Sequence, residues 1–361
     1  MDMTTYENIG HAYDYVEKIE DYGVGGLPES TLGIWLANEI APDEGLCRML
    51  LEEQQDFDVV RPGDDLSVFE CVIIPSRAGL LDGHEDKVNS FLDSGGKVLV
   101  LGDGLLYAAR SGTTIDCGAE YLGVGEFDMD FTLVGDVLVK AGQSGSILRA
   151  SGRETRIPAS PFLNYKSALR FQLQNEAEKL ASIQEPYFSR TFGRYCGHQN
   201  TPNRPVDAPH PAAWKHGNLV VIAHNLDRLY YTGGAKAQRD YFISALRLVH
   251  TTPMVEAALP STGRVSLLHQ EDKNRYVAHL LYGPPITRGN CTVIEDLPEL
   301  RDTRVILRLP EEVHSMRLIP EDVSLDFENI PGDNKGLVAY KTNVPSFSAH
   351  CGIVAEYSLP E

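Results

Sequence analysis

The sequence offers possible chemistry at a glycine-rich turn, Gly102-Asp103-Gly104, which follows the apolar run Lys97–Leu101. The two glycines allow backbone angles that other residues rarely adopt, and Asp103 supplies a carboxylate. In open sheets of parallel strands, ligands bind just beyond the carboxyl ends of the strands, where this turn would lie. A Gly-x-Gly sequence is too short to predict a dinucleotide site, because the third glycine and the partner acid of that fingerprint are missing. The turn is therefore either part of a functional crevice or a structural bend.

A second candidate is the proline-rich segment from Tyr195 to Trp214. Its prolines favour extended backbone, so we expect a long ordered loop rather than a helix or strand. Ordered loops of this length are often functional. The segment gathers side chains that could hydrogen-bond to a sugar or stack on it: His198, Gln199, Asn200, Arg204, Asp207, His210 and Trp214. The alternative interpretation is a loop that seals the domain or a subunit interface.

The pair Tyr230-Tyr231 could also contact a sugar, although aromatic residues in such a position usually pack in a core or an interface. Zinc is not expected, because neither Cys196 with His198 nor His210 with His216 has the spacing of zinc ligands. Nothing else in the sequence predicts a metal or a cofactor.

The elements that must position these residues follow from the apolar pattern. Short runs of apolar residues joined through helices predict a parallel sheet with both faces covered. The expected strands are 31–36, 57–60, 71–74, 97–101 and 218–223, and the expected helices are 44–54, 86–92 and 236–250. Right-handed crossovers then predict a flavodoxin-like, doubly wound α/β sheet. Residues 131–134 and 136–139 are expected to add an antiparallel excursion from the sheet, and 168–173 and 179–183 are further expected strands.

Beyond Pro260 the pattern changes to short alternating strands without helices. They are expected at 264–269, 275–281, 303–307, 313–318, 336–340 and 351–357, which predicts a small antiparallel β-sandwich. We therefore expect two domains: residues 1–252, an α/β domain that begins with an amphipathic helix at 6–20, and residues 253–361, the sandwich.

Composition limits the function classes. The 361 residues include 32 basic and 51 acidic ones, a net charge of -19, which disfavours binding to nucleic acid or to an anionic membrane surface. No apolar run approaches the roughly 18 residues of a membrane span, and the N-terminus lacks the features of a signal peptide. The six cysteines are scattered without a CxxC pair, so we expect reduced thiols in a cytoplasmic protein.

The order of helix, α/β domain and β-sandwich resembles the region that follows the catalytic (β/α)8 barrel in bacterial family 42 β-galactosidases and related fucosidase-like glycoside hydrolases. That region is called the β-galactosidase trimerisation domain. The matching motifs lie at 57–60, 91–100, 198–202 (His-Gln-Asn-Thr-Pro), 259–261, 274–282 and 293–296. One departure is Ala349-His350-Cys351-Gly352, where related chains often have a Gly-His-Gln turn.

The resemblance implies a non-catalytic role, because the catalytic carboxylates of these enzymes lie in the barrel, which we expect this chain to follow in cis or to meet in trans. It implies assembly into a dimer or trimer. It also implies that loops of one subunit can wall the active site of another, with His198 to Trp214 and Tyr230-Tyr231 nearest a glycan. The identity of that glycan, the symmetry of the assembly and the upstream sequence stay open.

Two other functions remain open at this point. Class I glutamine amidotransferases share the predicted α/β architecture and carry a nucleophilic cysteine in the turn that Gly102-Asp103-Gly104 would form. Here Asp103 stands in that turn and the nearest downstream thiol is Cys117, and a carboxylate cannot replace a thiolate in that acyl transfer. The other alternative is a free-standing carbohydrate-binding module.

Overall fold

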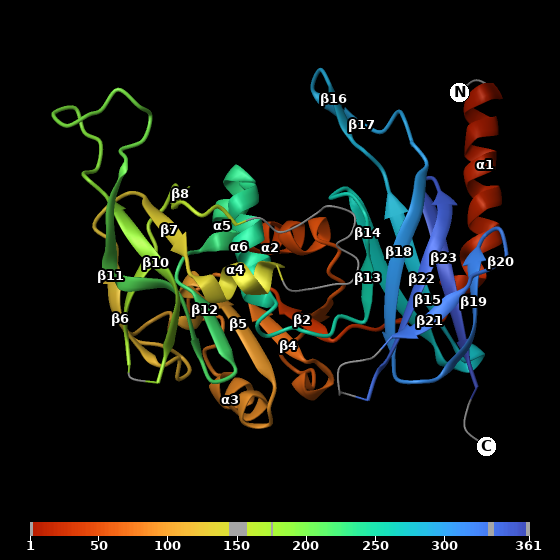
Figure 1. Cartoon of the computed structure of the whole chain (residues 1–361), viewed down its shortest axis with the longest axis horizontal. Coiled ribbons are helices and arrows are strands. Elements are labelled where there is room, and N and C mark those ends of the chain that lie inside the picture. The colour runs from red at the N-terminus through yellow and green to blue at the C-terminus, as the bar shows by residue number, and fades with distance from the viewer. Residues whose placement is uncertain (1–2, 144–156, 175, 331–335, 359–361) are drawn as a thin grey trace. The chain divides into compact units, whose positions relative to one another are not determined.

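The computed structural model describes residues 3–143, 157–174, 176–330 and 336–358 (Figure 1). The chain forms two compact units. One consists of Thr31–Leu50 and Phe57–Thr251, and is called the α/β unit below. The other consists of Met1–Ser30, Leu51–Asp56 and Thr252–Glu361, and is called the sandwich unit. None of the helices in the described residues is long and apolar enough to cross a membrane.

The parallel part of the α/β unit has the strands that the apolar runs predict. They are β2 (Leu32–Trp35), β3 (Asp58–Val60), β4 (Cys71–Ile74), β5 (Lys97–Leu101) and β12 (Leu219–Ile222). They pair in parallel in the order β3-β2-β4-β5-β12, so the first strand in the chain lies between the second and the third. Strands β4 and β12 are buried along their whole length, which explains why their sequences do not alternate between apolar and polar residues.

The same sheet continues with antiparallel strands on the far side of β12. These are β11 (Asn203–His216), β10 (Glu178–Pro186), β7 (Asp130–Val134) and β8 (Phe162–Asn164), while β6 (Ala119–Val124) and β9 (Leu169–Leu173) pair separately. The prediction of a long loop from Tyr195 to Trp214 is therefore wrong for most of its length, because the residues from Asn203 onward form a strand. The register between β10 and β11 shifts repeatedly where Pro205, Pro209 and Pro211 lie, and bulges of this kind allow prolines in a sheet.

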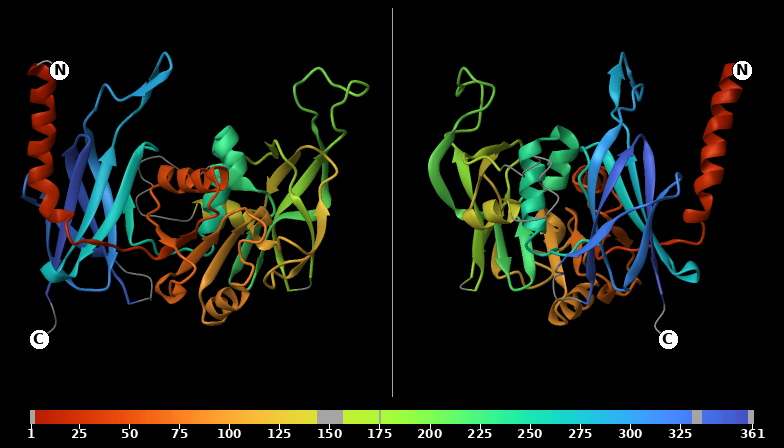
Figure 2. Two further views of the ribbon diagram at one scale, coloured as in Figure 1. Left: turned by 180° about the vertical axis from the view of Figure 1, so that it is seen from behind. Right: turned by 45° about the vertical axis from the view of Figure 1, so that its right-hand side comes forward.

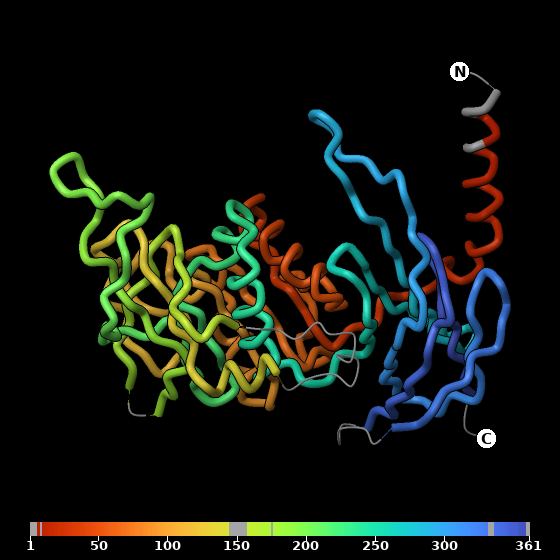
Figure 3. The backbone as a smooth tube through the Cα atoms, turned by 45° about the horizontal axis from the view of Figure 1, so that its top comes forward, coloured from red at the N-terminus to blue at the C-terminus, as the bar shows by residue number. Residues whose placement is uncertain are grey.

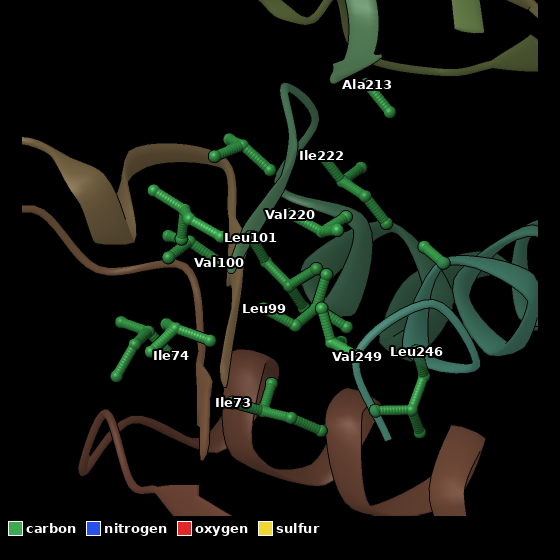
Figure 4. Close-up of a cluster of buried hydrophobic side chains, with 14 of the residues drawn as sticks. Ile73, Ile74, Leu99, Val100, Leu101, Ala213, Val220, Ile222, Leu246 and Val249 are labelled. Atoms are coloured by element: carbon green, nitrogen blue, oxygen red, sulfur yellow. The ribbon is translucent and has the colours of Figure 1, made fainter. Parts of the chain in front are cut away.

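The helices of the α/β unit are α2 (Ile40–Glu52), α3 (Glu85–Asp93), α4 (Asp136–Gln143), α5 (Leu226–Gly233) and α6 (Lys236–Leu246). Helix α4 corrects the strand expected at 136–139. Its two valines favour a strand locally, but Leu138, Ala141 and Gly142 lie on one buried helical face. In Figure 4, side chains of β4, β5 and β12 pack with Leu246 and Val249, at and beyond the end of α6, in the apolar core.

The sandwich unit contains two antiparallel sheets. One has the order β1-β14-β15-β23-β19-β20 and the other has the order β13-β18-β22-β21. Buried side chains from both sheets form one apolar core. The bounds are β1 (Leu27–Pro28), β13 (Val255–Ala257), β14 (Gly263–Gln270), β15 (Arg275–Tyr282), β18 (Leu300–Leu309), β19 (Val313–Ile319), β20 (Val323–Ser324), β21 (Phe327–Ile330), β22 (Val338–Phe347) and β23 (His350–Tyr357), with a hairpin of β16 (Ile286–Arg288) and β17 (Cys291–Val293).

The first thirty residues group with the sandwich unit, whereas the sequence pattern placed them in the α/β domain. Helix α1 (Met3–Ile19) contacts β23 through Tyr15, whose hydroxyl lies 2.6 Å from Nδ1 of His350. After the helix, Asp21 pairs with Arg275 at 2.8 Å and β1 pairs with β14. The exposed residues Ile9, Tyr13 and Val16 show that the apolar side of the helix is not packed, whereas Tyr22 beyond the helix packs against an apolar cluster of the sandwich.

Candidate functional site

The carboxyl ends of the parallel strands carry a group of polar side chains. Glu39 follows β2, Ser76 follows β4, Asp103 follows β5, and Asp227 and Arg228 follow β12. These ends lie at one edge of the sheet, because the strands are parallel and adjacent. We call these five residues the crevice cluster, since this is the position at which α/β proteins usually bind ligands.

Asp227 is the buried centre of the crevice cluster. Its carboxylate accepts hydrogen bonds from the backbone N–H of Ser76 at 2.7 Å, from the hydroxyl of Ser76, and from the backbone N–H of Arg228 at 2.8 Å. Burial raises the pKa of Asp227 to about 6, although these hydrogen bonds and the Arg228 charge favour the ionised form. The carboxylate is thus fully engaged by the protein and offers no free oxygen to a ligand.

Arg228 connects the buried part of the cluster to its exposed part. Its guanidinium donates to the carbonyl oxygen of Ser76 at 3.0 Å and to the Ser76 hydroxyl at 3.1 Å. The same guanidinium pairs with Glu39 at 2.7 Å, and Arg77 approaches Glu39 to 3.7 Å. Ser76 therefore contacts an acid and a cation, but its hydroxyl donates to Asp227 rather than to a histidine base, so it is not arranged as a nucleophile.

The turn after β5 is fixed by Asn225. The structure forms a short 3-10 helix at Gly102–Leu105, in which Gly102 has a φ of +47°. A Cβ at Gly102 would lie 1.7 Å from Oδ1 of Asn225, so only glycine fits. That oxygen accepts the backbone N–H of Asp103 at 2.9 Å. At Gly104 a Cβ would lie 2.2 Å from the Pro75 carbonyl oxygen. Close packing therefore explains why both positions are glycine.

Asp103 itself is the least satisfied member of the crevice cluster. Burial raises its pKa, against the opposing effect of the Arg228 guanidinium. Its Oδ1 is buried and has no hydrogen-bond partner among the described residues. The nearest downstream thiol, Cys117, is also buried, donates to the carbonyl oxygen of Ala119 at 3.4 Å, and has a pKa raised by burial to about 11. A thiol in that state does not supply the thiolate that acyl transfer requires.

A second buried polar group lies beside the antiparallel strands. Asp130 on β7 accepts from Nε2 of His224 at 2.7 Å, from Arg170 at 3.2 Å, and from the backbone N–H of Ala168 at 2.9 Å. Burial alone would raise the pKa of Asp130, but His224 and Arg170 hold it below its usual value. All three side chains are almost completely buried. The group therefore joins β7, β9 and the end of β12 rather than facing a ligand.

The most exposed candidate surface is the connection between β10 and β11, residues 187–202, which we call the arm. Figures 1, 2 and 3 show it as a green loop that extends beyond the strands of the α/β unit. Tyr187 is 53% exposed, Phe192 104% and Tyr195 76%. From residue 187 to 204 the sequence contains three arginines and one histidine but no acidic residue. The arm thus presents aromatic rings and positive charge on a chain whose net charge is -19.

The arm has a defined internal structure. Thr191 and Arg194 exchange backbone hydrogen bonds at its tip, at 2.9 and 3.2 Å. Arg190 donates to the carbonyl oxygen of Gln199, and the Cys196 thiol donates to that of His198 at 3.4 Å. The predicted residues His198, Gln199 and Asn200 therefore lie together on the arm, with the first two exposed.

The other predicted residues lie away from the tip of the arm. Arg204 is exposed near its base and donates to the carbonyl oxygen of Tyr187 at 3.2 Å. His210 on β11 contacts the carbonyl oxygen of Phe171 at 3.0 Å. Trp214 is wrong as a sugar contact. It is completely buried, its indole N–H donates to the carbonyl oxygen of Cys117 at 2.7 Å, and its ring packs 4.8 Å from that of Phe171.

The tyrosine pair lies on α5, the helix that also carries Asp227. Tyr230 is buried at 5% exposure, whereas Tyr231 is 38% exposed and has the guanidinium of Arg48 at 5.3 Å from its ring centre. The helix packs closely on α2, because a Cβ at Gly45 would lie 1.9 Å from the carbonyl oxygen of Asp227. Only Tyr231 of this pair has an accessible ring.

Sequence reasoning missed most of the crevice cluster. Ser76 and Asp227 follow apolar runs that were correctly predicted as strands, so listing every polar residue within five positions of a strand's end would have found them. Tyr187 and Phe192 of the arm were missed because they precede the proline-rich segment, and Tyr195 was not singled out although it begins that segment. The described residues contain no group of three or more His, Cys, Asp or Glu side chains that could hold a metal ion.

The comparisons with known proteins find a similar fold in parts of several glycoside hydrolases. No protein-family model and no curated protein sequence matches the chain. Among solved structures, the α-L-fucosidase isoenzyme 2 from Paenibacillus thiaminolyticus matches with a TM-score of 0.87 and 27% identity, covering 99% of this chain and 53% of that one. The chain therefore spans about half the length of that enzyme, over nearly its own full length.

Two β-galactosidases share the fold at lower identity. Gan42B, a family 42 enzyme from G. stearothermophilus, has a TM-score of 0.57 at 9% identity, with 99% of this chain and 44% of that chain covered. The enzyme from Bacillus circulans sp. alkalophilus has a TM-score of 0.53 at 10% identity, with 95% and 44% covered. The chain has the mixed α/β and β-sandwich fold found in one part of these larger glycoside hydrolases.

Proposed function

We propose that this chain is a non-catalytic oligomerisation and accessory region of a bacterial glycoside hydrolase of the α-L-fucosidase or β-galactosidase type. The observation that carries the proposal is the match to the fucosidase, which extends over 99% of this chain but only 53% of that enzyme. The remaining part of such an enzyme would supply the catalytic (β/α)8 barrel, in cis or in trans.

The strand order of the α/β unit supports the proposal that this unit is a trimerisation-type domain with a flavodoxin-like, amidotransferase-like sheet. Its parallel strands follow the order β3-β2-β4-β5-β12, which in chain order is second, first, third, fourth and fifth. Flavodoxin-like sheets have this order. The unit departs from an amidotransferase in its chemistry, because Asp103 lies in the turn and the Cys117 thiol is buried.

The crevice cluster supports a structural role for this edge of the sheet. Asp227, Ser76 and Arg228 satisfy one another by hydrogen bonds. A retaining glycosidase needs two carboxyl groups about 5 Å apart that both face the substrate. Asp227 does not face a substrate, since it is completely buried and accepts several protein donors. This supports the proposal that catalysis belongs to the rest of the parent enzyme.

The arm supports a role in assembly. Exposed aromatic rings on a projecting loop are typical of surfaces that become buried in a complex. The positive charge of Arg190 and Arg194 complements the acidic surface of a second copy of the same chain. In the assembled dimer or trimer, His198, Gln199, Asn200 and Arg204 would then lie near a neighbouring subunit and its glycan. Free thiols at all six cysteines fit a cytoplasmic location.

The proposal is tested by assaying the purified chain for assembly and hydrolysis together. Multi-angle light scattering should give the mass of a dimer or trimer, and nitrophenyl β-D-galactoside and α-L-fucoside should remain intact. A monomer at high concentration would contradict the assembly role. Turnover that the Asp103→Asn variant abolishes would instead support a self-sufficient hydrolase that uses the crevice.

A further inference from the structure

The smaller sheet of the sandwich unit carries a row of polar side chains across three strands. Arg304 on β18 lies opposite Asn343 on β22, and Lys341 on β22 lies opposite Glu328 on β21. Residues two apart on a strand face the same side, so Asn343 and Lys341 share a face. Directly opposed residues share a face as well. The register therefore places all four side chains on one side of the sheet.

A cavity of about 410 Å³ lies at this row. Arg304, Asn343, Lys341 and Glu328 line it together with Asp326 and Phe327. This volume falls within the range of about 300–1,000 Å³ that is usual for small-molecule sites. All of these residues belong to the sandwich unit, so the cavity does not depend on the α/β unit.

The wall formed by β21 is held in place by buried contacts. Thr342, which is 3% exposed, donates its hydroxyl to the carbonyl oxygen of Asp326 at 2.8 Å. The ring of Phe327 packs edge-on against that of Tyr340, with 5.9 Å between their centres. The backbone at Asp326 is thus held in place before any ligand binds, which reduces the entropy lost on binding. Phe327 lies opposite the buried Thr342, so its ring supports this wall from the core side of the sheet.

The lining has the chemistry of a site for an uncharged, hydroxyl-rich ligand. Its two cations, Arg304 and Lys341, balance its two carboxylates, Asp326 and Glu328, on a chain with a net charge of -19. Lys341 pairs with Glu328 at 2.5 Å. Within the described part of the chain, the guanidinium of Arg304 and the carboxylate of Asp326 have no side-chain partner, so donors and acceptors remain for hydroxyl groups.

We propose that this cavity is a carbohydrate-binding site for one or two neutral sugar rings. The fork of Arg304 and the amide of Asn343 would bind adjacent hydroxyls, and Asp326, two residues before Glu328, would accept from a third. An anionic ligand would meet Asp326 and Glu328, and a cationic one would meet Arg304 and Lys341. The proposal is independent of the assembly role of the arm.

The test is a titration of the full chain, followed by NMR or calorimetry, with D-galactose, L-fucose, lactose and maltose. D-Glucuronate and D-glucosamine serve as charged comparators. We expect saturable binding of at least one neutral sugar, weakened at least tenfold by Arg304→Ala and by Asn343→Ala. Arg301→Ala is the matched control, because Arg301 lies on the same strand outside the cavity and pairs with Glu299 at 2.6 Å.

Three results would overturn the proposal: no saturable binding of any neutral sugar, equal affinity in Arg304→Ala and the parent chain, or tighter binding of a charged comparator. Thermal unfolding of each variant checks that the sandwich is intact. Arg304→Lys serves as a second variant, since it keeps the charge and removes the planar fork, and it should also weaken binding. A failure to bind sugar would say nothing against the oligomeric state, which is measured separately, so the two proposals can fail independently.

Discussion

The crevice cluster and the arm are both regions of the α/β unit that carry candidate site residues, and they differ in how many contacts their side chains make with the rest of the chain. In the crevice cluster, Asp227, Ser76 and Arg228 are paired with one another, as buried polar groups must be. On the arm, Phe192 and Tyr195 are exposed and have no comparable contacts in the described chain. At the position where α/β proteins usually bind ligands, these three residues are engaged by the protein's own groups and Oδ1 of Asp103 is buried, whereas the exposed aromatic rings lie on the arm.

The difference indicates that the two regions respond differently to substitution. Substitutions of residues that hold the sheet together, including Trp214 on β11, should lower the free energy of unfolding. Substitutions at the tip of the arm should weaken assembly and leave the free energy of unfolding unchanged. The predictions below test this separation, in order of decreasing expected effect on stability.

The largest effect is expected at Trp214, which anchors β11 in the core. The Trp214→Ala variant should lose about 3–5 kcal/mol of unfolding free energy, because a buried indole leaves a cavity and an unpaired carbonyl at Cys117. Urea denaturation measures this loss, and Trp214→Phe should lose less. A fully stable Trp214→Ala variant would show that the residue is not a core anchor and would reopen its interpretation as a sugar contact.

A smaller but still large effect is expected at Asp227. Asp227→Ala removes the acceptor for Ser76 and for the Arg228 backbone, which should cost about 3 kcal/mol. The exposed Asp93→Ala variant is the control and should change stability by no more than about 0.5 kcal/mol.

The Asp227 effect should depend on pH. Burial raises the pKa from 3.8 to about 6, so the folded state keeps the proton to higher pH than the unfolded chain. The contribution of Asp227 is therefore full below pH 3.8 and is lost as pH rises through about 6. The stability difference between the parent chain and Asp227→Ala should be larger at pH 5 than at pH 8, by urea denaturation at both values. A larger difference at pH 8 would contradict the raised pKa.

The smallest effect on stability is expected on the arm. Phe192→Ala removes a fully exposed ring, so the unfolding free energy should change by no more than about 0.5 kcal/mol. Thermal and urea unfolding at a protein concentration below that needed for assembly measure this. A loss of several kcal/mol would mean that the ring packs within the subunit and that the arm and the crevice cluster do not differ as described.

The parallel strands and the sandwich strands could be predicted from sequence because their apolar runs are long and strongly patterned. The α4 helix could not, since Val137 and Val139 favour a strand locally and only packing against α6 decides for a helix. Strand β11 could not be predicted because its prolines are typical of loops. They are tolerated here because the pairing between β10 and β11 contains bulges. In these cases tertiary contacts decided the outcome.

The site was harder to predict than the fold. His198 and Gln199 lie on an exposed arm as expected for functional loop residues, but Trp214, only fifteen positions beyond Gln199, lies in the core. The difference comes from where the chain enters the core, because residues 211–214 of β11 are all buried while most of the residues before them are exposed, and composition does not reveal this. Phe192 and Tyr195 gain their significance only from exposure, and no local pattern distinguishes an exposed ring from a buried one.

The central claim is that the arm joins subunits, and sedimentation velocity of the parent chain and of the Phe192→Ala/Tyr195→Ala double variant tests it most directly. Across a concentration series, the parent chain should sediment as a dimer or trimer, and the double variant should shift towards monomer while its thermal unfolding stays unchanged. A parent chain that is monomeric at every concentration, or a variant that assembles as the parent does, would contradict the claim.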